Sequence, residues 1–183
     1  LKRRAIDRAD HVICISESTR RDLINLFGIS EEKLSVVHLG FEQFVSDYEP
    51  NNKNAIPAKP YLLYVGNRGG YKNFSGFLRA VASSDRIKAD FDILAFGGGG
   101  FSSMETTLLL ELGFRSDQVR QLGGDDTLLG YLYDKAAAFV FPSLYEGFGL
   151  PLLEAMAHRC PVISSNTSSM PEVASDAGEF FDP

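Results

Sequence analysis

The sequence predicts an α/β protein built on a doubly wound parallel sheet of the Rossmann-like type. From Tyr61 onward, short apolar runs alternate with helical segments of about three turns, which is the pattern of parallel strands covered by helices on both faces. Hydrophobic residues make up 44% of the 183 residues and charged residues 23%, so the chain can bury a sizeable core.

The first forty residues predict a strand, a helix and a second strand. The apolar runs at 11–15 and 35–39 are the two strands. Between them, Ser16 or Ser18 is suited to cap the amino end of a helix, and Gly28 is suited to end it.

Residues 47–60 are polar and contain three prolines, so a surface linker is expected before the repeating part. Within that part, Asp125 and Asp126 are suited to cap the helix that begins near Thr127. The expected strands are residues 61–66, 91–96, 119–124, 138–143 and 161–165, and the expected helices are residues 74–84, 102–114, 127–138 and 150–159.

Ligands of a doubly wound sheet bind outside the carboxyl ends of its strands, so the candidate functional residues lie in four turns. These are residues 66–73, 96–103, 122–127 and 143–151. The second turn has four consecutive glycines, which would let a ligand or a neighbouring loop approach closely. It does not meet the dinucleotide pattern Gly-x-Gly-x-x-Gly.

The first turn carries two cations, Arg68 and Lys72, at the carboxyl end of a strand. Arginine suits bidentate phosphate contact, and lysine acts as a point charge. The alternative is that both are solvated surface cations. The turn is not a Walker loop, because Gly-x-x-x-x-Gly-Lys-Ser/Thr is not met.

The fourth turn is suited to bind an anion. Gly147 and Gly149 free the backbone, and Pro151 suits the first turn of a helix. The amides of Phe148, Gly149 and Leu150 would then be unpaired donors at the positive end of that helix.

Two glutamates flank the fourth turn. Glu154 could cap the free amides of the helix, or it could accept hydrogen bonds from ligand hydroxyls. Glu146 precedes the helix and would repel a phosphate unless it faces a neutral polyol. A sugar attached to a diphosphate meets both conditions, with the phosphates on the amides and the hydroxyls on the carboxylates.

Composition excludes several classes of protein. A formal net charge of -6 argues against a general nucleic-acid binder. Cys14 and Cys160 lack the spacing of a metal site or a disulfide framework. No apolar run approaches the roughly 20 residues that cross a bilayer. Because the sequence begins with Leu1, a fragment of a longer protein is expected.

The sequence resembles the retaining glycosyltransferases of family 4, also called group 1, which have the two-domain GT-B fold. The stretch FPSLYEGFGLPLLEAMAHRCPVISSN is similar to that family's signature block, in which a glutamate, seven residues and a second glutamate match Glu146 and Glu154. YVGNRGGYKN resembles its basic loop and AFGGGG its second glycine-rich turn. The final residues, SSMPEVASDAGEFFDP, resemble the segment that leads to its last strand.

The resemblance implies a role for each matching residue. Arg68 and Lys72 would hold the donor's diphosphate and are implied to be catalytic together with Glu146, which would contact the transferred sugar. Asn67 stands where family members often have arginine, which makes the contact of Arg68 less certain than that of Lys72. Glu154 would accept from the nucleotide ribose. The implied donor-binding set is Gly66, Asn67, Arg68, Lys72, Gly147, Phe148, Gly149, Leu150 and Glu154.

The resemblance also implies the domain organisation. Residues 1–45 would be the end of the N-terminal, acceptor-binding domain and the crossing between domains. Residues 46–60 would be a linker, and residues 61–183 a truncated nucleotide-sugar-binding domain. The chain would then be the C-terminal half of a GT-B glycosyltransferase, with little activity by itself.

The implied function is transfer of a sugar from a nucleoside diphosphate sugar to a glycan or lipid-linked acceptor, with no cofactor and no metal. The loop YVGNRGGYKNF resembles that of mannosyltransferases of surface polysaccharide assembly, which favours GDP-mannose as the donor. The alternatives are a sugar-nucleotide epimerase of GT-B architecture and a donor-binding module that is inactive in isolation. A cytoplasmic location is expected, compatible with peripheral contact at the inner face of a membrane.

Overall fold

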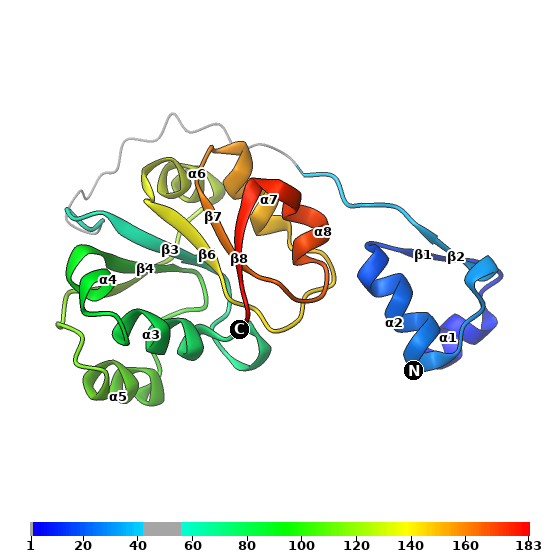
Figure 1. Ribbon diagram of the computed structural model, residues 1–183, viewed down its shortest axis with the longest axis horizontal. Helices are drawn as coiled ribbons and strands as arrows, with labels where there is room; N and C mark the ends of the chain where they lie inside the picture. The colour runs from blue at the N-terminus through cyan, green and yellow to red at the C-terminus, as the bar shows by residue number, and fades with distance from the viewer. Residues whose placement is uncertain (1, 42–55) are drawn as a thin grey trace.

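Six parallel strands form the central sheet in the computed structural model, which describes residues 2–41 and 56–183 (Figure 1). Their order across the sheet is β5-β4-β3-β6-β7-β8, so the predicted parallel α/β sheet is confirmed. The strands are β3 (Tyr61–Val65), β4 (Asp92–Phe96), β5 (Val119–Leu122), β6 (Ala138–Phe141), β7 (Val162–Ser165) and β8 (Gly178–Phe181).

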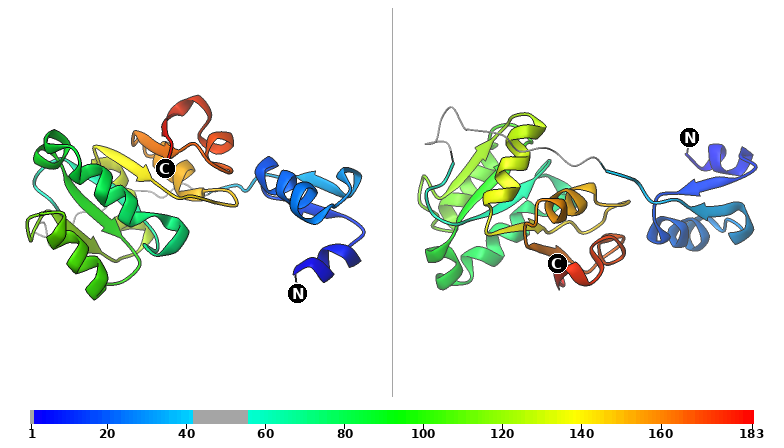
Figure 2. Two further views of the ribbon diagram at one scale, coloured as in Figure 1. Left: turned by 60° about the horizontal axis from the view of Figure 1, so that its bottom comes forward. Right: turned by 90° about the horizontal axis from the view of Figure 1, so that it is seen from above.

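Helices cover both faces of this sheet because side chains alternate along each strand (Figure 2). Leu63 and Phe139 point to the face that α6, α7 and α8 cover, whereas Leu62 and Val140 point to the face that α3 covers. The helices are α3 (Phe74–Ala82), α4 (Asp85–Asp90), α5 (Ser103–Glu111), α6 (Asp126–Lys135), α7 (Leu150–Ala157) and α8 (Met170–Ala174).

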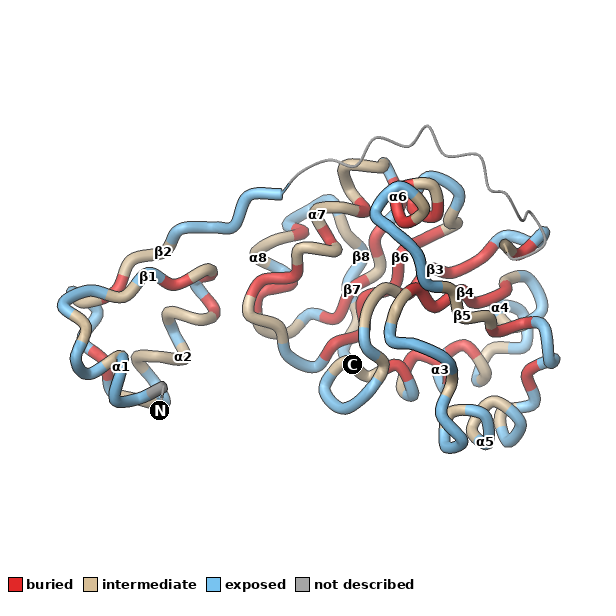
Figure 3. The backbone as a smooth tube through the Cα atoms, turned by 180° about the vertical axis from the view of Figure 1, so that it is seen from behind, coloured by how far each residue is buried: buried red, intermediate tan, exposed pale blue. Residues whose placement is uncertain are grey.

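The central strands are the most deeply buried part of the chain (Figure 3). Every residue of β4 and of β6 is buried. Strands that are covered on both faces read as continuous apolar runs, which is why these segments were recognisable in the sequence.

A smaller unit precedes the sheet. It contains α1 (Lys2–Arg8), β1 (Val12–Cys14), α2 (Glu17–Phe27) and β2 (Leu34–Val36), with β1 and β2 paired in parallel. The Ser16 hydroxyl accepts a hydrogen bond from the amide of Thr19, so Ser16 and not Ser18 is the cap of α2. Gly28 ends α2 in the left-handed region at φ 66°, as predicted.

The amino end of α2 contacts the part of the chain around α8. The carboxylate of Glu172 accepts hydrogen bonds from the amides of Glu17 and Ser18, at 2.8 and 3.2 Å. Tyr145 donates its hydroxyl hydrogen to Asp22 at 2.6 Å. The start of α2 is therefore capped by a side chain that is more than 150 residues away in the sequence.

Several predicted boundaries were wrong. Helices α1 and α4 were not predicted, because both are short, polar segments without apolar periodicity. The helix expected at 127–138 ends at Lys135, since Ala138 already belongs to β6. The strand expected at 35–39 is Leu34–Val36. Residues 46–55 of the predicted linker lie outside the described residues.

Candidate functional site

The turns after β3 and β6 meet at the point where the strand order reverses. From β3 the chain adds β4 and β5 on one side and then returns to place β6 on the other side of β3. In open α/β sheets, ligands bind in the crevice at this switch point, outside the carboxyl ends of the strands. The amide of Leu144 donates to the carbonyl of Tyr71 at 2.7 Å, which ties the two turns together.

Lys72 and Glu146 form an ion pair across the switch point. The distance from Nζ of Lys72 to Oε1 of Glu146 is 2.7 Å, and the two side chains are only 22% and 12% exposed. The alternative that Lys72 is a freely solvated cation is therefore wrong, and its contact with a diphosphate stays a prediction. The pair also explains how a carboxylate is tolerated beside the turn that is predicted to bind an anion, because Lys72 balances the charge of Glu146.

The fourth turn presents backbone amides at the start of α7. Gly149 caps the helix at φ 105° without a side-chain hydrogen bond, and Pro151 lies in the first turn as expected. Within the described residues, the amides of Gly147, Phe148, Gly149 and Leu150 donate to no acceptor. The last three are the unpaired donors that the sequence predicts, and the resemblance adds Gly147; their binding of an anion stays a prediction.

Serine hydroxyls hold the carbonyl groups of the same turn. Ser169 donates to the carbonyls of Glu146 and Phe148, at 2.9 and 2.8 Å. Ser168 both donates to the carbonyl of Glu146 at 3.0 Å and accepts from its amide at 2.8 Å. Ser16, from the smaller unit, donates to the carbonyl of Gly147 at 2.7 Å. We call Ser16, Ser168 and Ser169 the serine clamp.

The serine clamp fixes where the amides point. In a trans peptide the carbonyl of one residue and the amide of the next point in opposite directions. Holding the carbonyls of Glu146, Gly147 and Phe148 therefore directs the amides of the three residues that follow them away from the serines. Sequence reasoning did not predict these contacts, because the serines lie 21 to 131 positions from their partners in the chain.

Glu154 does not cap its helix. It lies beyond the first turn of α7, and its Oε2 accepts a hydrogen bond from the hydroxyl of Tyr133 at 3.1 Å. Burial raises the pKa of the Glu154 carboxyl, and this outweighs the hydrogen bond from Tyr133, which lowers it. Of the two predicted roles, capping is wrong, and acceptance of ligand hydroxyls stays a prediction.

Arg68 points into the glycine-rich turn after β4. Its Nε donates to Glu105 at 2.6 Å, and its terminal nitrogens donate to the carbonyls of Gly97, Gly99 and Gly100, each at 2.9 Å. The side chain is 4% exposed, so the alternative of a solvated cation is wrong. Its contact with a diphosphate stays a prediction, but in this arrangement the guanidinium is already occupied.

Burial raises the pKa of the Glu105 carboxyl, but hydrogen bonds from Arg68 and from Ser102 outweigh it, so the pKa lies below its ordinary value. Glu105 also closes a capping box with Ser102 at the start of α5.

Gly66 and Asn67 lie between β3 and Arg68. Gly66 has φ 117°, and its amide donates to the carbonyl of Phe96 at 2.9 Å, which brings the turns after β3 and β4 together. The carbonyl of Asn67 accepts from the hydroxyl of Tyr64. These contacts are made by the backbone of Gly66 and Asn67, and within residues 2–41 and 56–183 the Asn67 side chain has no hydrogen-bond partner.

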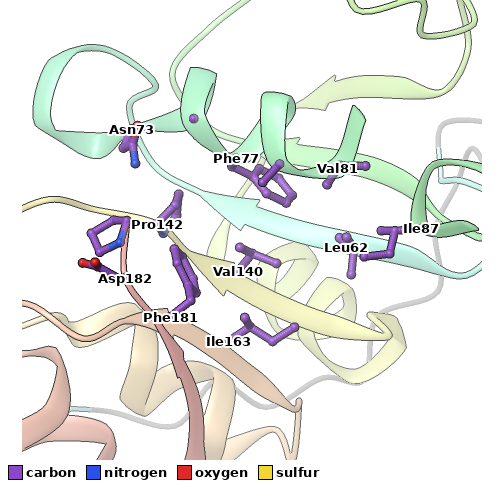
Figure 4. A pocket seen from close by; sticks show the side chains of 13 residues that line it. Leu62, Asn73, Phe77, Val81, Ile87, Val140, Pro142, Ile163, Phe181 and Asp182 are labelled. Carbon is purple, nitrogen blue, oxygen red and sulfur yellow. The ribbon is translucent and has the colours of Figure 1, made fainter. Parts of the chain in front are cut away.

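An apolar hollow of about 280 Å³ lies on the face of the sheet that α3 covers (Figure 4). Leu62, Val140 and Ile163 line it from three neighbouring strands, and Phe77 lines it from α3. Such a lining offers few partners for phosphates or hydroxyls, so the candidate site is the carboxyl edge and not this hollow.

In residues 2–41 and 56–183, no three His, Cys, Asp or Glu side chains gather in a way that could hold a metal ion. None of the helices described is long and apolar enough to span a bilayer. Metal-free chemistry stays an expectation.

Comparison with known proteins agrees with the fold and with the motifs. O-antigen chain mannosyltransferase B of Escherichia coli is 34% identical over 192 residues, which covers 98% of this chain and 49% of that protein. Among solved structures, sucrose-phosphate synthase from Thermosynechococcus elongatus superimposes with a TM-score of 0.78 at 25% identity, over all of this chain and 47% of that one. The lipopolysaccharide outer core galactosyltransferase WaaB superimposes with a TM-score of 0.68 at 26% identity, over 96% of this chain and 49% of that one.

The chain spans about half the length of these relatives. The likeness to solved glycosyltransferases confirms the GT-B type of α/β fold that the motifs implied. Residues 1–43 match Glycosyltransferase Family 4, and residues 47–183 match Glycosyl transferases group 1. Since the second match covers most of the chain, this chain belongs to the group 1 glycosyl transferases.

Proposed function

We propose that the full-length protein is a glycosyltransferase that moves a sugar from a nucleoside diphosphate sugar to a glycan or lipid-linked acceptor, with retention of configuration. The observation that supports it best is the meeting of Lys72, Glu146 and four unpaired amides at the switch point of the sheet. A cation and a helix amino end suit the diphosphate, and a carboxylate suits the sugar hydroxyls.

The leaving group of such a transfer is a nucleoside diphosphate, whose negative charge grows as the glycosidic bond breaks. Fixed donors that face this charge lower the barrier, because they need no reorganisation during the reaction. Lys72 and the amides of residues 147–150 are those donors in our proposal. Glu146 orients the transferred sugar, which is a proximity effect and not nucleophilic attack.

Glu154 is proposed to accept from the ribose hydroxyls. It lies on α7, the helix whose first amides would bind the diphosphate, and its half-buried carboxylate already accepts from Tyr133. The named function of the Escherichia coli relative favours a mannose donor, and the loop that contains Lys72 favours it too. GDP-mannose is therefore the first donor to test. A cytoplasmic location, with peripheral contact at a membrane, would suit this donor and a lipid-linked acceptor.

The test combines donor binding with product analysis on the full-length protein. A panel of nucleoside diphosphate sugars is titrated by calorimetry, and the products made with the best donor are analysed for a new glycosidic bond. A new glycosidic bond would support transfer. An isomerised donor would indicate the epimerase. Binding of a donor without turnover would indicate a donor-binding module. If no member of the panel binds, the proposal is wrong.

Substitution of Lys72 tests the diphosphate assignment. Lys72→Ala is expected to lower transfer by about a hundredfold, because one fixed donor to the developing charge is lost. Lys59→Ala is the matched control, since Lys59 is an exposed lysine just before the amino end of β3, at the opposite edge of the sheet. Equal turnover of the two variants would remove Lys72 from the proposed mechanism.

A further inference from the structure

Arg68 has the chemistry of a phosphate ligand but not the position of one. Its guanidinium faces one carboxylate and four carbonyl groups, three at 2.9 Å and that of Gly98 at 3.5 Å, and it lies 4.9 Å from the centre of the Phe101 ring. With 4% of the side chain exposed, a ligand could reach it only if these bonds were broken. Breaking hydrogen bonds to a buried charged group is costly, so this arrangement opposes direct ligation.

We propose that Arg68 is a positioning residue, which locks the glycine-rich turn at residues 97–100 so that the amides of this turn face the donor. The inference rests on the proposed function and changes the role of one residue in it. Arg68 then acts through the backbone of the turn and through Glu105, and it does not touch the diphosphate.

Peptide geometry says which amides Arg68 directs. The carbonyls of Gly97, Gly99 and Gly100 point at the guanidinium, and no cis peptide bond occurs in the described part of the chain. The amide that follows each carbonyl points the opposite way. The amides of Gly98, Gly100 and Phe101 therefore point away from Arg68, and they donate to no acceptor within the described residues.

The turn is built around the guanidinium. Gly97, Gly98 and Gly99 have φ of 86°, 69° and 69°, a run of left-handed residues that only glycine adopts readily. A Cβ on Gly98 would come within 2.8 Å of a terminal nitrogen of Arg68 and 3.0 Å of the carbonyl oxygen of Gly66. Gly98 therefore provides the space for Arg68 as well as the backbone angle.

Glu105 holds the other end of the guanidinium. Its Oε1 pairs with Arg68, and its Oε2 accepts from the amide and the hydroxyl of Ser102. Because Nε and the terminal nitrogens of one planar group contact different acceptors, arginine fits and lysine does not. The orientation of Arg68 is thus coupled to the start of α5.

Glu105→Gln distinguishes the two possible roles of Arg68, because they predict opposite changes in the affinity for the diphosphate. If Arg68 bound the diphosphate, removing a competing negative charge would strengthen the binding. If Arg68 positions the turn, a weaker anchor loosens the turn and weakens the binding. Glutamine can keep the capping box, so the start of α5 is preserved.

The experiment measures the affinity of the full-length protein for GDP and for UDP by calorimetry. For whichever nucleotide binds, Glu105→Gln and Arg68→Lys are each expected to weaken binding about tenfold, the loss of one hydrogen bond to a charged group. Ser102→Ala controls for fraying of α5, since it weakens the cap but leaves Oε1 of Glu105 on Arg68. Far-ultraviolet circular dichroism and melting temperature show whether each variant is folded.

Three glycine-to-alanine variants provide a second measurement in which neither Arg68 nor Glu105 is substituted. Gly98→Ala both strains the backbone and displaces the guanidinium, and Gly99→Ala strains the backbone in open space. Gly40→Ala is the matched control, because Gly40 lies outside the turn, has open space around it and does not need a positive φ. The loss of affinity is expected to be greatest for Gly98→Ala, smaller for Gly99→Ala and almost none for Gly40→Ala.

The possible outcomes are distinct. Unchanged or tighter binding by Glu105→Gln would overturn the positioning role of Arg68 and leave the proposed function intact, and so would equal affinities of the three glycine variants. If the wild-type protein bound neither nucleotide, the proposed function would fail and this role would fail with it.

Discussion

The contacts of the serine clamp predict how Ser169→Ala changes stability and diphosphate binding. Ser169 is fully buried, and its hydroxyl is the donor for the carbonyl of Phe148 and one of two donors for the carbonyl of Glu146. Ser169→Ala removes the hydroxyl and little else. Ser168 still donates to Glu146, whereas the carbonyl of Phe148 loses its hydrogen bond.

The expected loss of stability follows from these contacts. A buried carbonyl that is left without a donor costs about 1–3 kcal/mol, so Ser169→Ala should lower the free energy of unfolding by about 2 kcal/mol. The amide of Gly149 shares a peptide plane with the carbonyl of Phe148, so its direction is no longer fixed. Loss of one well-directed donor to an anion should weaken binding of a nucleoside diphosphate about tenfold.

Urea unfolding of wild-type and variant proteins, run in parallel, gives the stability difference, and calorimetry gives the affinity. Ser83→Ala is the matched control, because the Ser83 hydroxyl also donates to a carbonyl, that of Ala80 at 2.8 Å, but at an exposed helix end. The control should stay within about 0.5 kcal/mol of wild type. If Ser169→Ala matched this control in both stability and affinity, the clamp would have no influence on the turn.

Two further predictions concern the carboxylates. Glu146→Gln should strengthen binding of a nucleoside diphosphate severalfold, because Lys72 is released from its ion pair, and it should also lower sugar transfer. Calorimetry measures the binding, and product formation measures the transfer. If binding and transfer changed in the same direction, the reasoning would be contradicted. Burial raises the pKa of the Glu154 carboxyl. Because the ionised carboxylate is the expected acceptor of the ribose hydroxyls, its contribution to affinity should be complete above this pKa and should be lost as the pH falls through it. The difference between the pH profiles of wild type and Glu154→Gln isolates this step, because titration of the ligand phosphates cancels; parallel profiles would exclude Glu154 from the binding site.

The sequence predicted most strands and the longer helices because these elements are marked locally. Strands that are buried on both faces appear as uninterrupted apolar runs, and caps such as Ser16, Gly28 and Asp125 mark the helix ends. Helix α4 carries no such mark beyond its cap Ser84, since its six residues are mostly polar and none is buried. Its position depends on packing against α3, which a single sequence does not show.

The pairing of Lys72 with Glu146 could not be predicted in the same way. The two residues are 74 positions apart, and they meet only because β6 lies beside β3 and not beside β5. The order of strands in a parallel sheet is a property of the whole fold, and local periodicity does not contain it. The sequence could identify both residue types as candidates but not their contact.

The partners of Arg68 could not be predicted from the sequence for a different reason. An arginine in a turn after a strand suits a phosphate, a carboxylate or a set of carbonyls equally well, because the same planar donors serve all three. What distinguishes them is burial and the direction of the side chain, and both depend on the turn after β4. The four consecutive glycines were visible in the sequence, but their relation to Arg68 was not.

The charges around the site explain how a chain with a net charge of -6 could bind an anion at this edge. Two of the carboxylates nearest the turns are paired, Glu146 with Lys72 and Glu105 with Arg68, so each pair is close to neutral. The field that remains comes from backbone amides whose directions the serine clamp and Arg68 set. Oriented dipoles of this kind attract a diphosphate without a cluster of exposed cations, which would bind other anions as well. In the proposed function, Lys72 would exchange one carboxylate for the phosphates, and Glu146 would become available to the sugar only when the donor has bound.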